Sequence, residues 1–308
     1  MNVRRAARWC GWLLWFVAAV RPASAQVDAP QPVQLATLVQ PPGLVVHFLD
    51  AGAGDAAWVV MPDNSSVLID CGPPELSKQL LLQLQAAGLT TIDLLAPGRS
   101  TPDASGGCAD VVRYLRVRSV LWSPGMSLSP AVRGLDTELA NANVDRETGV
   151  AGWTREYLNA RLTLFNPSVV PVGNPNDDSQ VLLLEYGASG VLFAGGVHDA
   201  GEAQLRAATD PQAQPTLAGR SITVLRAADH GAPGTNEPNF LRQVFPGGAA
   251  AVVVSDSAVR GAAQPDAETR QRLAGLVSPR GQLLETARHG SITLTLGFDG
   301  SLSVSTDR

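Results

Sequence analysis

Histidine, cysteine and lysine are scarce in this chain, and each scarcity excludes a class of protein. The 308 residues include four histidines, three cysteines and a single lysine, Lys78. Four histidines are a small supply for a metalloenzyme, because imidazole is a common metal ligand. Three cysteines exclude a disulfide-dense scaffold, and a chain of this length buries enough surface to fold without one. No apolar run after residue 25 reaches the length of about 20 residues that spans a bilayer.

The charge balance of the chain is acidic. It carries 23 Lys+Arg against 28 Asp+Glu, a formal net charge of −5. With 45% hydrophobic and 17% charged residues, the composition is typical of a globular protein rather than a disordered one. A nucleic-acid-binding protein needs a basic surface to displace counterions from phosphates. We therefore do not expect nucleic acid as a partner.

The first 25 residues are typical of a secretory signal peptide. Arg4, Arg5 and Arg8 form a basic region, residues 9–20 are apolar, and an A-x-A motif at 23–25 precedes Gln26. The apolar run is shorter than a membrane span, although an uncleaved anchor is the alternative. We therefore expect an exported bacterial protein, periplasmic or secreted, whose mature chain has no membrane span. Removal of the four arginines in 1–25, a segment without acids, changes the net charge from −5 to −9.

Patterns of strands and helices alternate after a proline-rich, extended lead-in at 26–43. Strands are predicted at 44–50, 56–61, 66–70, 92–96, 118–122, 160–165, 180–186, 190–194, 221–227 and 249–255. Helices are predicted at about 76–87, with Gly88 as the stop, at 107–116, from 129–130 onward, and at 200–208, 236–245 and 266–276. The closing segments 282–286, 291–298 and 302–305 are expected to form a β-meander. This order predicts a single layered α/β domain over residues 44–305.

One segment of the first half of the chain resembles a segment of the second half. VVMPDNSSVLIDCG (59–72) aligns without gaps with LLEYGASGVLFAGG (183–196). Each has the pattern of a hairpin whose second strand runs into a glycine-containing loop, although few positions are identical. The repeat predicts two related β-units packed face to face, with helices outside. Their strand-end loops, at Gly72 and Gly196, would meet at one edge, where a site is expected.

Several motifs together resemble the metallo-β-lactamase-like domain of the ComEC/Rec2 competence protein family. HFLDAGAGDAAWVVMPDNSSVLIDCG is similar to the opening of that domain, in which LDVGQGDA precedes a hairpin ending in LIDCG. NPNDDSQVLLLEYGASGVLFAGG is similar to the segment that ends in TGD, and VLRAADHGAPGT is similar to VLKxxHHGSxxS. LLETARHGSITLTLGFDG fits the closing strands. The resemblance covers about residues 44–305 and implies a four-layer αβ/βα sandwich with its site at one edge.

The resemblance also shows that metal ligands are missing from the first metal-binding motif. The family has roughly DLLLLTHxHxDHIGG, whereas residues 93–107 are DLLAPGRSTPDASGG. Arg99, Thr101 and Ala104 occupy the histidine positions, and only Asp103 is kept. The flanking residues match, including the glycine pair before the next helix.

The later motifs have lost ligands as well. The aspartate of TGD is Gly196 here, and the first histidine of HHG is Asp229, while His230 is kept. The late GHP motif corresponds to Ala263-Gln264-Pro265, again without histidine. The pocket that the resemblance implies, in place of the family's metal site, is lined by Arg99, Thr101, Asp103, Ala104, Gly196, Asp229 and His230.

The ligand count indicates that the metal has been lost. A catalytic zinc takes about three protein ligands and a water, and Asp103, Asp229 and His230 are the remaining donors. The guanidinium of Arg99 cannot lose a proton to bind a metal, and its charge would repel a cation. We therefore expect no metal cofactor, with zinc as the cofactor only if the site has rearranged.

Two enclosed carboxylates without a cation between them are costly. We hypothesise that Arg99 supplies the missing positive charge and pairs with Asp103, Asp229 or both. The alternative is that Arg99 is a solvated loop arginine, as most arginines are.

Other polar residues are weaker candidates for function. His47 is interpreted as a packed strand residue and His289 as part of a turn. His198-Asp199 could be a relocated metal pair, although such a pair is common in loops. Asp50 and Asp55 match the family's LDVGQGDA, and we expect them to fix the loop through side-chain-to-backbone hydrogen bonds.

Two cysteines, Cys71 and Cys108, are left once Cys10 is removed with the signal. An oxidising compartment permits a disulfide between them, but their spacing does not establish one, and two buried thiols are the alternative. In the resembled fold the two positions lie near each other.

Three functions are consistent with these observations. The first is an exported, non-catalytic pseudo-hydrolase that binds an unknown ligand or envelope protein where the metal site would lie. The second is an active metal-dependent hydrolase, of phosphodiesterase or nuclease type, with a rearranged site. The third is DNA processing, which the acidic charge and the missing ligands disfavour. We favour the first. Because a fold alone does not determine a function, its binding role is inferred by elimination.

Overall fold

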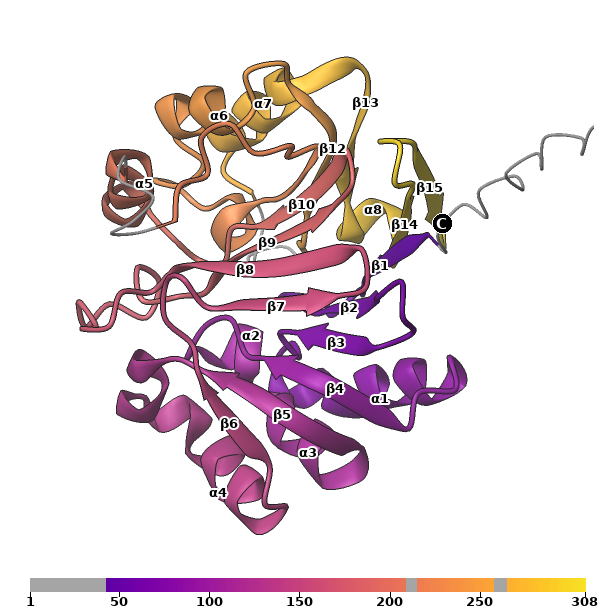
Figure 1. Ribbon diagram of the computed structural model, residues 1–308, viewed down its shortest axis with the longest axis vertical. Helices are drawn as coiled ribbons and strands as arrows, with labels where there is room; N and C mark the ends of the chain where they lie inside the picture. Colours follow the sequence, from indigo (N-terminus) through magenta and orange to yellow (C-terminus); the bar gives the residue numbers. More distant parts are fainter. Residues whose placement is uncertain (1–42, 209–214, 258–264) are drawn as a thin grey trace, which may run out of the picture. The chain divides into compact units, whose positions relative to one another are not determined.

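The structure, a computed structural model, describes residues 43–208, 215–257 and 265–308 (Figure 1). The predicted signal peptide at 1–25 and nearly all of the lead-in lie outside the described residues, as do Ala263 and Gln264. Within the described residues, no helix is both long enough and apolar enough to cross a membrane.

The described strands form two sheets. The first has the order β15-β14-β1-β2-β3-β4-β5-β6 and the second β13-β12-β11-β10-β9-β8-β7. The strands of the first sheet are Leu44–Phe48 (β1), Ala57–Val60 (β2), Ser66–Ile69 (β3), Thr91–Ala96 (β4), Arg116–Trp122 (β5), Asp145–Thr148 (β6), Ile292–Leu296 (β14) and Leu302–Thr306 (β15). Those of the second are Thr154–Tyr157 (β7), Ala160–Asn166 (β8), Val181–Tyr186 (β9), Ser189–Phe193 (β10), Val224–Arg226 (β11), Ala249–Val254 (β12) and Val277–Glu285 (β13).

The helices lie between these strands in the chain. The α-helices are Ser77–Ala86 (α1), Pro102–Ser105 (α2), Cys108–Tyr114 (α3), Arg133–Asn141 (α4), Asp199–Ala207 (α5), Pro238–Val244 (α6), Ala267–Leu276 (α7) and Thr286–His289 (α8). The 3₁₀-helices are Pro74–Leu76 (η1), Pro124–Leu128 (η2), Pro130–Val132 (η3) and Ala228–Gly231 (η4). Helix α1 ends as predicted, because Gly88 takes a positive φ of 79° and the amide N–H groups of Gly88 and Leu89 donate back to Gln85 and Leu84.

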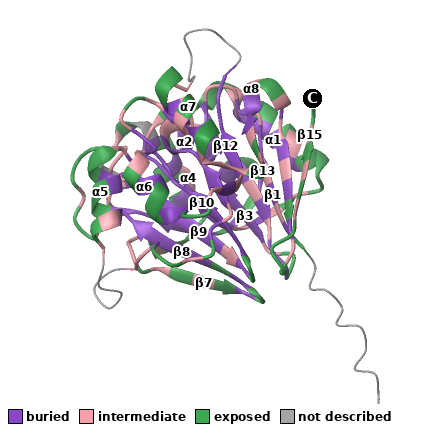
Figure 2. Cartoon of the chain, turned by 90° about the horizontal axis from the view of Figure 1, so that it is seen from above, coloured by how far each residue is buried: buried purple, intermediate pink, exposed green. Residues whose placement is uncertain are grey.

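Alternation along the strands produces four layers. In β9, Leu182, Leu184 and Tyr186 face the other sheet, whereas Val181 and Leu183 face the helices. Side chains of α1, α3 and α4 join the core on the outer face of the first sheet, and those of α5, α6 and α7 join the core on the outer face of the second. Buried residues accordingly fill the strands of the interior in Figure 2, and exposed residues gather on the outer helices. The predicted four-layer αβ/βα sandwich is confirmed.

The weak internal repeat corresponds to two equivalent units. Strands β2 and β3 form an antiparallel hairpin, as do β9 and β10. The second strand of each hairpin then pairs in parallel with the next strand of its sheet, β3 with β4 and β10 with β11. Because the carboxyl ends of parallel strands lie at one edge of a sheet, both units direct their loops to a common side.

The structure differs from the sequence predictions about the elements in three respects. The closing segments do not form a meander, because β13 pairs in parallel with β12 while β14 and β15 belong to the other sheet. Strands β6 and β7 were not predicted, since their mostly exposed, polar sequences DRET and TREY have no apolar alternation. The helix expected from residue 129 begins with the 3₁₀ turn η3, and α4 starts only at Arg133.

A disulfide joins Cys71 to Cys108, with their Cα atoms 5.1 Å apart. Cys71 lies in the loop after β3 and Cys108 is the first residue of α3. Both residues are buried. The structure thus decides between the two alternatives for these cysteines, and the bridge fixes the start of α3 to the edge of the first sheet.

Candidate functional site

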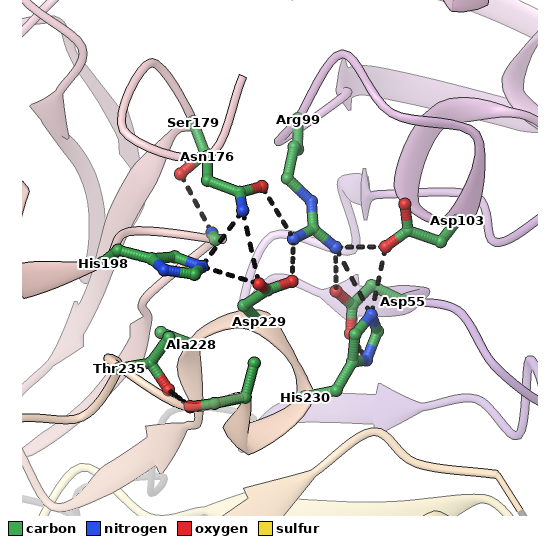
Figure 3. Close-up of polar contacts among 12 residues, drawn as sticks. Asp55, Arg99, Asp103, Asn176, Ser179, His198, Ala228, Asp229, His230 and Thr235 are labelled. Carbon is green, nitrogen blue, oxygen red and sulfur yellow. Dashed lines mark hydrogen bonds and ion pairs between the residues drawn. The ribbon is translucent and has the colours of Figure 1, made fainter. Parts of the chain in front are cut away.

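Charged side chains from both sheets meet at the edge where the parallel strands end (Figure 3). Asp70 follows β3 and Arg99 follows β4 in the first sheet, whereas Arg226 ends β11 of the second. Asp229 and His230 lie in η4, directly after β11. The topology thus brings together groups that are distant in the sequence.

The deepest part of this cluster is formed by Asp55, Asp70 and Arg226, each almost fully buried. Arg226 donates to Asp70 over 2.9 Å and forms an ion pair with Asp55. Asp70 also accepts a hydrogen bond from the amide of Gly98 at 2.7 Å. Burial raises the pKa of Asp70 to about 6, against the opposing charge of Arg226. Burial acts in the same direction on Asp55, but Arg226, His230 and Arg99 together hold the pKa of Asp55 below its usual range.

Arg99 lies at the centre of the outer part of the cluster, with a side chain that is only 3% exposed. Nη1 donates to Asp229 and Nη2 donates to Asp103. Nη2 also lies 3.6 Å from a carboxylate oxygen of Asp55. Nη1 further contacts the Asn176 amide oxygen at 3.3 Å. Burial opposes the charge of Arg99, but the three carboxylates raise its pKa further above neutrality. The hypothesis that Arg99 pairs with Asp103 and Asp229 is confirmed.

His230 has acceptors at both ring nitrogens. Nδ1 is 2.8 Å from the carbonyl oxygen of Ser255, and Nε2 is 3.0 Å from the carboxylate of Asp103. Although burial favours the neutral ring, Asp55 and Asp103 raise the pKa of His230 to about 9. An imidazolium, with a proton on each nitrogen, satisfies both acceptors. Burial likewise opposes ionisation of Asp103, but the bond with His230 and the charge of Arg99 lower its pKa.

Asp229 is held from three directions. Its Oδ1 accepts from Arg99. Its Oδ2 lies 2.7 Å from Nε2 of His198 and 3.3 Å from the side-chain nitrogen Nδ2 of Asn176. Asn176 comes from the β8–β9 loop, and His198 precedes α5. Asp229 therefore connects the Arg99 loop to two loops of the second sheet.

The backbone that presents Asp229 and His230 is strained. Asp229 (φ 42°, ψ 50°) and His230 (φ 55°, ψ 17°) are consecutive left-handed residues with side chains. The Asn236 side chain pairs with both backbone groups of Ala228, the residue before them. The buried carboxylate of Glu202 in turn accepts from the amide of Asn236 at 2.6 Å. Burial raises the pKa of Glu202 to about 7.

Gly196, which aligns with the aspartate of TGD in the resembled family, lies directly against Arg99. A Cβ atom built on Gly196 would be 2.7 Å from both Cδ and Nη1 of Arg99. Such a distance is too short for two non-bonded atoms, so a side chain at residue 196 and this arginine cannot coexist in this arrangement. The Arg99 side chain thus occupies the space that a side chain at residue 196 would need.

The structure brings Arg99, Asp103, Asp229 and His230 into one hydrogen-bonded cluster. Thr101 and Ala104 have other places: Thr101 is the N-cap residue of α2, and the backbone carbonyl of buried Ala104 accepts from the amide of Cys71. Sequence reasoning missed the parts played by Arg226, Asp70 and Asn176. A lone charge in the buried strand VLR, and an aspartate directly after SVLI, were the available signals for the first two.

Several weaker expectations are also decided. The expectation for Asp55 is wrong, because its carboxylate faces Arg226 and Arg99 instead of fixing its own loop. Asp50 does fix the loop, by accepting from the amide of Gly52. His47 packs within the sheet, stacked on Trp58 with 4.6 Å between ring centroids. His289 is structural, because its Nδ1 lies 3.1 Å from the amide nitrogen and 2.9 Å from the carbonyl oxygen of Glu285.

A metal ion has one group of three donors among the described residues. Oxygens of Asp55 and Asp103 and a nitrogen of His230 lie within 4.8 Å of one another. Their number is suitable for zinc, but the donors are already engaged. Arg99 holds the two carboxylates, and His230 donates toward Asp103 and the Ser255 carbonyl. In this arrangement the residues do not fit a metal, because the guanidinium already supplies the positive charge.

A pocket of about 200 Å³ opens beside the Arg99 loop. It lies between Ser100, η2 and Pro130 on one side and the β8–β9 loop, through Gly173, Pro175 and Asp178, on the other. Among the described residues that line it, Asp178 is the only charged one.

The chain resembles solved structures, whereas no protein-family model and no curated protein sequence matches it. Zn²⁺-bound PqqB from Methylobacterium extorquens superposes with a TM-score of 0.51 and 14% identity, over 82% of this chain and all of PqqB. Tm1679, described as a metal-dependent hydrolase of the β-lactamase superfamily, gives a TM-score of 0.50 and 12% identity, over 86% of this chain and all of its own. At such identities the matches establish the fold alone. The chain has the metallo-β-lactamase fold.

Proposed function

We propose that this protein is an exported, non-catalytic relative of the ComEC/Rec2 metallo-β-lactamase-like domains. It binds a ligand or an envelope protein at the edge where a metal would otherwise lie. The observation that carries the proposal is the position of Arg99, whose guanidinium reaches Asp55, Asp103 and Asp229 at once. Metal-dependent hydrolases use the metal to lower the pKa of a bound water molecule. A water molecule at this edge would have no metal to do so.

Metal content is the direct test of this proposal. The protein, purified and incubated with zinc or with manganese, is passed through a desalting column, and its metal is measured by elemental analysis. We expect far less than one ion per chain and no hydrolysis of bis(p-nitrophenyl) phosphate. An Arg99→Ala variant, which keeps Asp55, Asp103 and His230, is the matched control and is expected to retain more zinc than the wild type. Stoichiometric metal in the wild type would overturn the proposal.

The second candidate is an active metal-dependent hydrolase with a rearranged site. The proximity of Asp55, Asp103 and His230, within 4.8 Å, favours it. In this case Arg99 would leave the cluster when the metal binds. Stoichiometric metal together with hydrolysis that Asp103→Asn abolishes would support this candidate over the first.

A further inference from the structure

The β8–β9 loop carries a group of apolar side chains in solvent. Val169, Val170 and Val172 are 71%, 74% and 63% exposed, and the first two are the most exposed of the large hydrophobic residues that the structure describes. The loop extends away from the sheets at the left of Figure 1. Apolar side chains grouped in this way are more typical of an interaction surface than isolated ones, which are common on any protein.

The loop is fastened although its tip is exposed. The Asp178 carboxylate accepts from the amides of Val172 and Gly173, at 2.7 and 2.8 Å. At its base, the Asn166 side chain donates to the carbonyls of Asp177 and Ser179, both at 2.7 Å. These bonds hold the valines in place before any partner arrives, which lowers the entropic cost of binding.

The same loop forms one wall of the pocket beside Arg99. The described residues that line the pocket are small or apolar apart from one carboxylate: Ser100, Gly125, Ser129, Pro130, Gly173, Pro175 and Asp178. Its volume of about 200 Å³ is below the roughly 300–1,000 Å³ of sites for free small molecules. It suits a single side chain that a larger molecule presents.

We infer that the valine tip and this pocket form a docking surface for a segment of another protein. The segment inserts one apolar side chain into the pocket and has uncharged or basic residues beside it, because Asp178 lines the pocket and the chain is acidic. A second copy of the chain is a poor occupant, since both copies carry net negative charge. A bilayer is also a poor occupant, since the tip lacks the aromatic and basic residues of membrane-binding segments.

This inference rests on the proposed function, because it names the kind of protein that binds at the edge of the sheets where Arg99 lies. The surface is probed with a phage-displayed library of random peptides selected on the purified protein, and enriched peptides are synthesised and titrated by fluorescence polarisation. We expect enriched peptides with an apolar residue next to lysine or arginine. The V169S/V170S/V172S variant, which keeps the backbone amide bonded to Asp178, should bind them at least tenfold more weakly. Val170→Asp, at the most exposed position, is a second variant with the same expectation.

The matched control is L82S/L158S, which changes residues of similar exposure (57% and 66%) outside the β8–β9 loop and should leave binding unchanged. The inference is overturned if no peptides are enriched, or if the variants at the tip bind them as the wild type does. It is also overturned if the valines mediate binding to phosphatidylethanolamine–phosphatidylglycerol vesicles instead. Stoichiometric metal would refute the proposed function without touching the peptide result, so the two failures are distinguishable.

Discussion

At the scale of single residues, the site depends on a close contact between a glycine and an arginine. Gly196 leaves room for the Arg99 side chain, which in turn supplies the charge that Asp103 and Asp229 need. The φ of Gly196 is not in the left-handed region, so its backbone would accept alanine. The three atoms nearest to a Cβ atom built there all belong to Arg99, so the requirement for glycine comes from this side chain.

This contact makes Gly196→Ala a specific test. Overpacking should cost about 1–3 kcal/mol of unfolding free energy, measured by urea denaturation. In an Arg99→Ser background the added methyl group has space, so the same change should be nearly neutral, and the two mutations should couple. Gly247→Ala is the control, because nothing lies within 4 Å of a Cβ atom there. Equal effects of Gly196→Ala in both backgrounds would contradict this explanation.

The members of the charged cluster that the sequence pointed to are those that occupy a recognisable motif position. Arg99, Asp103, Asp229 and His230 could be found because each stands at or next to a ligand position of the resembled family. Asn176 could not, because it lies in a loop whose fold depends on long-range contacts. Asp55 was found but misinterpreted, because its match to a loop motif did not reveal Arg226 in the other sheet.

At the scale of elements, the edge of the first sheet is fixed to α3 covalently. The disulfide closes a separation of 37 residues that contains α1, β4 and Arg99. The same region is joined by hydrogen bonds from the amide of Cys71 to Ala104 and from the amide of Gly107 to Gly72. The loop that carries Arg99 is therefore enclosed between two fixed ends.

Removal of this bridge should destabilise the whole chain. C71A/C108A is expected to lose about 2–4 kcal/mol of unfolding free energy, mainly because the unfolded chain gains freedom. Urea denaturation monitored by tryptophan fluorescence measures the loss. The wild type denatured with a reducing agent present is the control and should show a similar midpoint. A loss below about 1 kcal/mol would mean that the hydrogen bonds alone hold these elements together.

The elements that the sequence predicts best are buried strands and amphipathic helices. Strands β3, β9 and β10 were visible because their apolar residues are buried on both faces, and β2 because its buried residues alternate. Edge strands β6 and β7 escaped prediction because exposure removes that pattern. The partner of β13 could not be predicted, since α8 redirects the chain from one sheet to the other.

At the scale of the whole described fold, ion pairs join the two sheets at the site. Asp55, Asp70 and Arg99 lie in loops of the first sheet and Asp103 lies in α2, whereas Arg226, Asp229 and His230 lie in or directly after β11 of the second sheet. All but Asp103 and Asp229 are buried, and buried ions without partners are costly. The packing of the two sheets at this edge therefore depends on their charge states.

Stability should accordingly fall at alkaline pH. The pKa of His230 is about 9 in the folded protein against 6.5 for a free histidine, so the folded state holds the proton more tightly. The stabilisation of the folded state that follows from this tighter proton binding is fully present below pH 6.5 and is lost as the pH rises through about 9. We expect a loss on the order of a few kcal/mol over this range, measured as urea midpoints. His230→Gln should flatten the profile, and His289→Gln should not. An equally steep profile in the His230 variant would exclude this residue as the cause.

The guanidinium of Arg99 has one last consequence, which concerns mass action. A protein that holds a dissociable ion gains stability only in proportion to the logarithm of the free ion concentration, and loses it when a chelator removes the ion. Here the positive charge is covalently attached to the chain and cannot be diluted or sequestered. The edge of the two sheets thus keeps its cation whatever the supply of metal in its surroundings.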